Sequence, residues 1–229
     1  MSKMKIKHPL VKGKVKEVKP FIYCVQVDDD YDRAMLFCRY QEFYESQYKK
    51  FRSKPFTWME YMRYYKNDWK KRTFTYPDDW AGYNIPSNSL QKSHGIFCKD
   101  TEYDTIMNDI YWYCTKDSTE KNDGTKCNWY LIGASSKDLR TLDHEIAHGL
   151  YFTNLEYKKE VTKLIKGIKP THYEKLKKKL IKMGYVNDKK IIDDEINAFM
   201  STGLYNGMDT KELKVYQKDF KKNFKKYSK

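Results

Sequence analysis

The chain has 229 residues and a mass of 27.7 kDa, which suits one domain of ordinary size with enough apolar side chains for a core. Hydrophobic residues make up 40% of the sequence and aromatic residues 16%, which excludes a chain that is disordered throughout. The net charge is +14, and the sequence has neither an apolar run of membrane-spanning length nor a secretory signal, so we expect an intracellular, cytoplasmic protein.

The first elements are read from the spacing of apolar residues. Residues 1–19 alternate lysine with small or apolar residues, which is typical of a basic arm or of an edge strand. Residues 21–27 predict a buried strand that ends at three consecutive aspartates. Between residues 36 and 48 leucine, tyrosine and phenylalanine recur at helical spacing, so we expect a helix there.

A second helix is predicted after Pro55. Thr57 and Glu60 have the spacing of a capping box, in which each side chain bonds the other residue's backbone N–H. One apolar stripe follows at helical spacing, made of Trp58, Met62, Tyr65 and Trp69. Stripes of this kind pack in a core far more often than they stack on bases, so we interpret this one as a core face.

The middle of the chain is rich in turn-forming residues. Residues 73–105 predict a long ordered loop of the kind that often lines a site. Residues 106–114 and 129–134 are predicted strands, separated by a turn at Asn122-Asp123-Gly124. From residue 135 onward we expect only helices, with breaks near 167–170, 184–188 and 203–209.

The positive charge is concentrated toward the C-terminus. Residues 151–229 hold 20 lysines against 10 acidic residues. The chain has 39 lysines but only 6 arginines, although arginine is the residue expected for bidentate recognition of bases and phosphates. A nucleic-acid partner is therefore possible but not favoured, and a solvated surface together with codon bias explains the charge better.

The five cysteines argue against two kinds of site. Their number is odd and no two form a C-x-x-C pair, so neither a disulfide framework nor a cysteine-rich zinc site is expected. His94 and Cys98 lie four residues apart, but nothing nearby completes a metal site. We therefore expect reduced thiols, most of them buried.

The most informative stretch is the H-E-x-x-H sequence of His144, Glu145 and His148. On a helix, the two histidines lie within about 40° of each other, so they can share one metal ion. Glu145 is then placed to take a proton from a water molecule. A capping-box spacing between Ser135 and Asp138 predicts that the helix starts just upstream. Its apolar residues cluster on the opposite side, namely Leu139, Leu142, Ile146 and Leu150.

Two histidines need a third protein ligand, and five residues are candidates. They are Glu156, His172, Asp193, Asp194 and Glu195. Glu195 alone falls within the apolar stripe of its predicted helix, where an ionised carboxylate needs a nearby cation. Asp193 and Asp194 fall outside that stripe, where solvent or helix capping suffices. A buried salt bridge with a lysine is the alternative explanation for Glu195.

The segment from about 130 to 205 resembles the zincin metallopeptidases. Beyond H-E-x-x-H it shares Thr141 before the motif and Leu150 after it, while the third histidine of the metzincins is absent. A downstream glutamate in a Glu-x-x-Ala setting, here Glu195 and Ala198, resembles the gluzincin branch. The resemblance implies an α+β zincin-like domain over residues 20–229, with an N-terminal mixed sheet and helices over 20–134 and a helical half over 135–229.

The resemblance also implies a chemistry. His144, His148 and Glu195 would hold Zn²⁺, and Glu145 would act as general base toward a zinc-activated water in peptide-bond hydrolysis. Because no feature that captures a substrate's α-amino group is recognisable, we expect an endopeptidase acting on peptides or proteins. The oxyanion would need a further donor, and the candidates are Tyr151, His172, Tyr185 and Tyr205.

Two other functions remain open at this point. The chain could be a basic nucleic-acid- or protein-binding module on an inactive zincin scaffold. It could also be a zinc hydrolase that acts on a bond other than a peptide, because attack by an activated water is not specific to amides. The sequence does not indicate the natural substrate, the biological role or the oligomeric state.

Overall fold

The computed structural model describes residues 3–68, 73–97, 100–204, 208 and 210–229. The chain forms two compact units, Met1–Leu142 and Asp143–Lys229, and the single domain expected over residues 20–229 stays a prediction. The predicted halves meet after residue 134, whereas the boundary between the units falls inside helix α6 (Leu139–Thr153). A helix that continues across the boundary gives no break in sequence pattern by which the boundary could be located.

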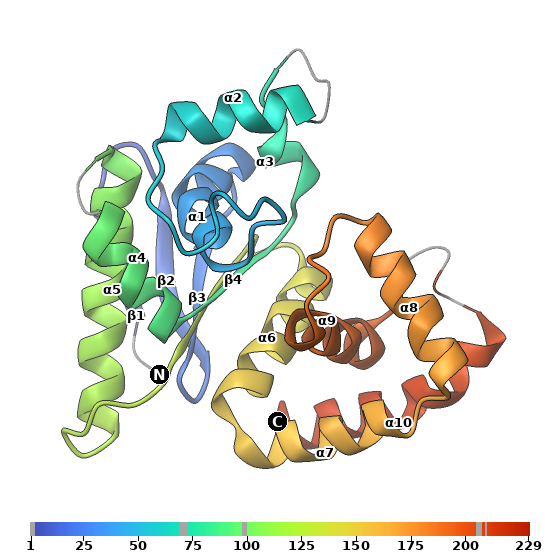
Figure 1. Ribbon diagram of the computed structural model, residues 1–229. Helices are drawn as coiled ribbons and strands as arrows, with labels where there is room; N and C mark the ends of the chain where they lie inside the picture. Colours follow the sequence, from blue (N-terminus) through green and yellow to red (C-terminus); the bar gives the residue numbers. More distant parts are fainter. Residues whose placement is uncertain (1–2, 69–72, 98–99, 205–207, 209) are drawn as a thin grey trace. The chain divides into compact units, whose positions relative to one another are not determined.

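The first unit is built on a mixed sheet of five strands in its described part (Figure 1). The strands follow the spatial order β1-β2-β3-β5-β4, and only the pair β3 and β5 is parallel. Their bounds are β1 (Lys3–Lys5), β2 (Gly13–Lys19), β3 (Ile22–Val27), β4 (Tyr83–Pro86) and β5 (Tyr130–Ala134). The predicted strands at 21–27 and 129–134 are thereby confirmed as β3 and β5.

The N-terminal segment is more ordered than a basic arm. Strand β1 is an edge strand, but β2 is bonded to β1 on one side and to β3 on the other. The alternation of lysines with apolar residues explains this pairing, because Val11 and Val15 are fully buried while the lysines between them remain accessible. The prediction of an arm or edge strand over residues 1–19 is therefore correct only for β1.

The two helices predicted between residues 36 and 48 and after Pro55 are confirmed, and capping hydrogen bonds mark where each one begins. Helix α1 (Asp30–Glu45) is capped by Asp29, whose side chain accepts from the backbone N–H of Asp32. Helix α2 (Trp58–Asp68) begins with the expected capping box, because Thr57 N–H donates to Glu60 and Glu60 N–H donates to the Thr57 hydroxyl. Trp69, the last residue of the predicted stripe, lies outside the described residues, as does Cys98.

The long loop predicted over residues 73–105 is wrong. That stretch contains α3 (Tyr76–Asp79), strand β4 and α4 (Ser87–Phe97). Its turn-forming residues begin elements instead of separating them: Pro77 lies at the start of α3, where its missing N–H costs no helical bond. Ser87 begins α4, and its hydroxyl accepts a hydrogen bond from Trp129 N–H.

The strand predicted over residues 106–114 is also wrong, since these residues lie inside the long helix α5 (Glu102–Lys121). Thr101 caps this helix by accepting from the backbone N–H of Asp104. Ile106, Ile110 and Cys114 are four residues apart and all buried, which is a helical spacing. The turn at 122–124 is confirmed, with left-handed backbone angles at Asp123 and Gly124.

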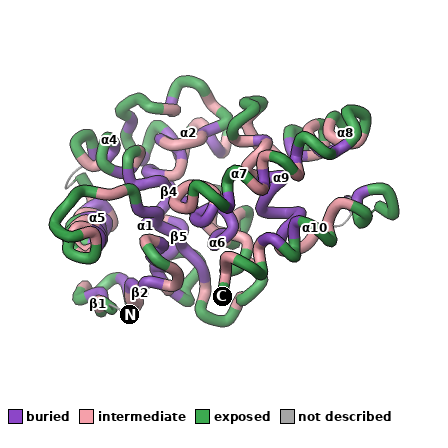
Figure 2. Tube along the Cα trace, turned by 90° about the horizontal axis from the view of Figure 1, so that it is seen from below, coloured by how far each residue is buried: buried purple, intermediate pink, exposed green. Residues whose placement is uncertain are grey.

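Side chains from one face of the sheet form the core of the first unit together with α1, α2, α4 and α5. Tyr23, Val25 and Leu131 are fully buried in this aromatic-rich cluster, and Figure 2 shows β5 buried along its length. Helix α1 lies so close to β5 that a Cβ atom on Gly133 would come within 2.6 Å of the Phe37 ring. Glycine at this position is therefore required by the close approach of the helix.

The regular elements in the described part of the second unit are all helices. After α6 come α7 (Leu155–Lys166), α8 (Pro170–Lys182), α9 (Lys189–Thr202) and α10 (Lys211–Tyr227), and α7 and α10 lie side by side (Figure 1). The predicted breaks at 167–170 and 184–188 are confirmed, and the third falls between α9 and α10. No described helix is long and apolar enough to cross a membrane.

Candidate metal centre

Helix α6 presents its two histidines on one side. Its cap is Asp138, whose carboxylate accepts a hydrogen bond from Thr141 N–H, so the helix starts at Leu139. The expected cap at Ser135 is not used, because the Ser135 hydroxyl donates to the Asp28 carboxylate instead. One turn later, Nε2 of His144 and Nε2 of His148 lie 3.3 Å apart.

The apolar side of α6 is shorter than predicted. Ile146 and Leu150 are buried, as the helical spacing predicts, but Leu139 is 67% exposed. Leu139 is the first residue of the helix, where the chain has only begun to pack. Burial therefore starts near the histidines and holds the part of α6 that carries them.

Glu195 comes to the same point from helix α9. Its carboxylate oxygens lie 3.8 Å from Nε2 of His144 and 3.6 Å from Nε2 of His148, and the three donor atoms all lie within 4.8 Å of one another. In a tetrahedral zinc site with bonds of about 2.0–2.1 Å, neighbouring ligand atoms are about 3.3–3.4 Å apart. The two imidazole nitrogens match that spacing. The distances from Glu195 are a few tenths of an ångström longer and belong to different oxygens, Oε2 toward His144 and Oε1 toward His148.

Burial makes this cluster a costly arrangement without a cation. Glu195 and His148 are each 2% exposed, and one carboxylate oxygen of Glu195 is buried with no hydrogen-bond partner in the described part of the chain. Burial raises the pKa of the Glu195 carboxyl to about 8, despite the opposing attraction of His148. The ion pairs of Glu195 with described residues are to the two histidines, and none is to a lysine.

The donor set suits zinc. Two imidazole nitrogens and one carboxylate oxygen are ligands that zinc accepts, and three protein ligands leave a fourth position for water or substrate. Negative charge around the histidines also favours a bound cation. Burial lowers the pKa of His148, but the charges of Asp194 and Glu195 outweigh burial and hold that pKa well above its ordinary value. The residues present therefore fit a divalent metal ion.

Glu145 lies inside the same region without being one of the three converging donors. Its side chain is only 5% exposed, and its charge acts on both His148 and Glu195. A buried carboxylate next to two imidazoles can hold and release a proton. The structure thus brings together all four residues on which the sequence prediction depends.

The other candidates for third ligand lie elsewhere. Glu156 lies in the first turn of the separate helix α7 and is exposed, with its carboxylate 2.7 Å from the Lys159 amine. His172 contacts helix α10, where its Nδ1 lies 3.1 Å from the Tyr216 hydroxyl. Asp193 accepts a hydrogen bond from the Tyr173 hydroxyl.

Asp194 is the residue that sequence reasoning missed. Predicted to face solvent or to cap a helix, it does neither, because Asp188 caps α9 and an Asp194 oxygen lies 3.1 Å from Nδ1 of His148. The error came from considering α9 by itself, since a helical wheel does not show that a neighbouring histidine reaches past the apolar stripe. A usable signal existed: a ligating histidine needs an acceptor for its second ring N–H, and an acidic residue stands next to the predicted ligand.

Tyr185 is the oxyanion candidate that lies at the cluster. Its hydroxyl bonds the Glu195 carboxylate, and its ring packs edge-on against Phe199, which in turn contacts the His144 ring. Tyr151 bonds Thr162 instead. Tyr205 lies outside the described residues.

Comparisons with known proteins add no family to this picture. No protein-family model matches the chain, nor does any curated protein or solved structure. The function must therefore be inferred from the site itself.

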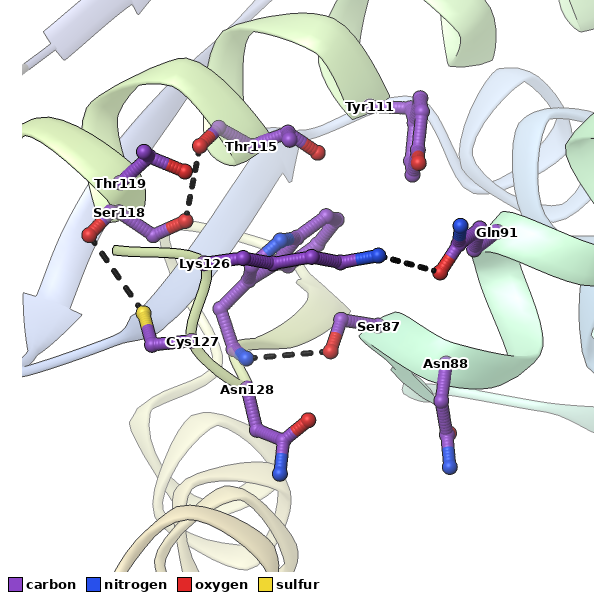
Figure 3. A pocket seen from close by; sticks show the side chains of 11 residues that line it. Ser87, Asn88, Gln91, Tyr111, Thr115, Ser118, Thr119, Lys126, Cys127 and Asn128 are labelled. Atoms are coloured by element: carbon purple, nitrogen blue, oxygen red, sulfur yellow. Dashed lines mark hydrogen bonds between the residues drawn. The ribbon is translucent and has the colours of Figure 1, made fainter. Parts of the chain in front are cut away.

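A polar pocket of about 140 Å³ in the first unit is a separate feature (Figure 3). It lies between α4, α5 and the segment before β5. The Lys126 amine reaches across it to the Gln91 side chain at 2.9 Å, and the Ser118 and Cys127 side chains donate to backbone carbonyls. None of the predicted site residues lines it.

Proposed function

We propose that this protein is a zinc-dependent metallopeptidase, and specifically an endopeptidase, whose metal is held by His144, His148 and Glu195. The observation that carries the proposal is the convergence of these three donor atoms from two helices at a buried point. A solvated histidine pair would not require a buried carboxylate from another helix, whereas a metal site does.

Zinc bound by these ligands supplies Lewis acidity, which lowers the pKa of a water molecule and polarises a carbonyl group. Glu145 takes up the proton of the attacking water and returns it to the leaving nitrogen, a role that its burial beside His148 favours. The Tyr185 hydroxyl is the best-placed donor for the developing oxyanion, because it already reaches the Glu195 carboxylate. The low accessibility of the cluster excludes bulk water and strengthens each of these interactions.

Glu145→Gln is the first test, because it keeps the shape of the side chain and removes its basicity. The purified protein should contain about one zinc per chain, and it should cleave a denatured protein mixture. The Glu145→Gln variant should keep its zinc and lose turnover by several orders of magnitude. The measurements are metal content and peptide-bond cleavage on the same samples.

Glu156→Gln serves as control, because Glu156 lies exposed on α7. Loss of zinc together with activity in Glu145→Gln would show that Glu145 is a ligand and not a base. Zinc binding without cleavage of any peptide would point to a hydrolase of another bond. A chain that binds no zinc would favour the binding module on an inactive scaffold.

A further inference from the structure

His148 is as deeply buried as Glu195, and both of its ring nitrogens have acidic neighbours. Nε2 faces Glu195 at 3.6 Å, on the side where the three donor atoms converge. Nδ1 faces an Asp194 oxygen at 3.1 Å. Nδ1 of His148 and the Asp194 oxygen that faces it are both buried, and neither has another hydrogen-bond partner in the described part of the chain.

We propose that Asp194 is the positioning residue of this site: its carboxylate holds the proton of His148 on Nδ1, so that the Nε2 lone pair is directed at the metal. The inference rests on the metal site proposed above. A neutral imidazole carries one proton, which can sit on either nitrogen, and only the Nδ1–H form can coordinate through Nε2. A carboxylate next to Nδ1 selects that form, fixes the ring plane and makes Nε2 more basic.

Other roles for Asp194 do not account for its position. It is the sixth residue of α9, too far along the helix to cap it, and the cap is Asp188. Among the described residues its ion-pair partner is His148, whereas its neighbour Asp193 pairs with Lys189 and accepts from the Tyr173 hydroxyl. The two adjacent aspartates thus point to different sides of α9, and of the two it is Asp194 that contacts a proposed metal ligand.

This difference supplies a matched pair of variants. Asp194→Ala removes the acceptor at His148, and Asp193→Ala removes the same chemical group one residue earlier. Asp194→Asn keeps an oxygen acceptor without the charge, which tests geometry against charge. Circular dichroism establishes that each variant is folded, and Asp194→Asn is the variant to use should Asp194→Ala not fold.

Zinc affinity by competition with a chelator is the main measurement. Asp194→Ala should bind zinc about ten- to a hundred-fold more weakly than the unmodified chain, whereas Asp193→Ala should bind it almost as tightly. Asp194→Asn should fall between them.

A second measurement reports the tautomer directly. Nitrogen-15 NMR of the zinc-loaded protein should show His148 protonated at Nδ1, with slow exchange of that proton in the unmodified chain and fast exchange in Asp194→Ala. A merely structural role for Asp194 would leave this exchange unchanged.

The outcomes separate the two proposals. Equal zinc affinity and equal proton exchange in the Asp194 and Asp193 variants would overturn the positioning role and leave the metal site intact. Absence of zinc binding by the unmodified chain, or binding that survives His144→Ala, would overturn the metal site and the positioning role together.

Discussion

Replacing Glu195 by glutamine should make the metal-free protein more stable and its zinc binding weaker. Burial raises the pKa of Glu195 from an ordinary 4.5 to about 8. An acid whose pKa is higher in the folded state than in the unfolded state destabilises the fold once the pH exceeds the unfolded value, because folding must then take up a proton or bury a charge. At pH 7 this difference amounts to roughly 3 kcal/mol, which a neutral glutamine avoids.

Urea denaturation in the presence of EDTA measures this effect, and the transition of the second unit is the one to compare. Between about pH 5 and pH 8 the free energy of unfolding of the unmodified chain should fall as the pH rises, and the Glu195→Gln variant should show a smaller fall. In the presence of zinc the unmodified chain should be the more stable of the two, because it gains a free energy of zinc binding that the Glu195→Gln variant lacks. The control, Glu156→Gln, alters an exposed residue and should change either quantity by less than about 0.5 kcal/mol. A Glu195→Gln protein that is no more stable than the unmodified chain in EDTA at pH 7 would refute the reasoning.

Two further predictions concern packing. Asn197 is fully buried, and its side chain donates to a carbonyl of α6 and accepts from a hydroxyl of α7. Asn197→Ala should therefore lower the free energy of unfolding by about 2–4 kcal/mol in urea denaturation and weaken zinc binding. Unchanged zinc affinity would show that the link to α6 does not hold the ligands in place. Gly133→Ala should lower the free energy of unfolding by about 1–3 kcal/mol, because the new methyl group would meet the Phe37 ring. Gly95→Ala, in a helix with open space around it, should be neutral or stabilising by up to about 1 kcal/mol. Equal effects of the two changes in thermal denaturation would contradict the close approach of α1 to β5.

The parts of the site that a single helix determines could be predicted from sequence. The side-by-side placement of His144 and His148 follows from helical geometry, which does not depend on the rest of the fold. Glu195 could be selected because a carboxylate in an apolar stripe needs an explanation wherever the helix packs. Asp194 could not be placed in this way, because its role depends on where the ring of a different helix lies.

The errors in the first unit have local causes. Residues 106–114 suit a strand or a buried helix, and a short apolar run does not distinguish the two, whereas the N-cap at Thr101 marks the start of a helix. The turn formers of residues 73–105 start helices as readily as they form loops, as Pro77 and Ser87 show. Helix starts and turns share the same residue types, so composition could not separate them.

Three polar residues within four consecutive positions of α9 account for much of the proposed metal chemistry. Asp194 contacts the second nitrogen of His148, Glu195 faces both histidines, and Asn197 bonds the backbone carbonyl of Ala147 on α6. Each of these polar side chains would destabilise a helix that served only packing, because burying an acid or an amide is unfavourable unless every polar group finds a partner. All of them, together with both histidines, belong to the second unit. The proposed metal site therefore takes all of its protein ligands from Asp143–Lys229 and does not depend on how the two units are arranged.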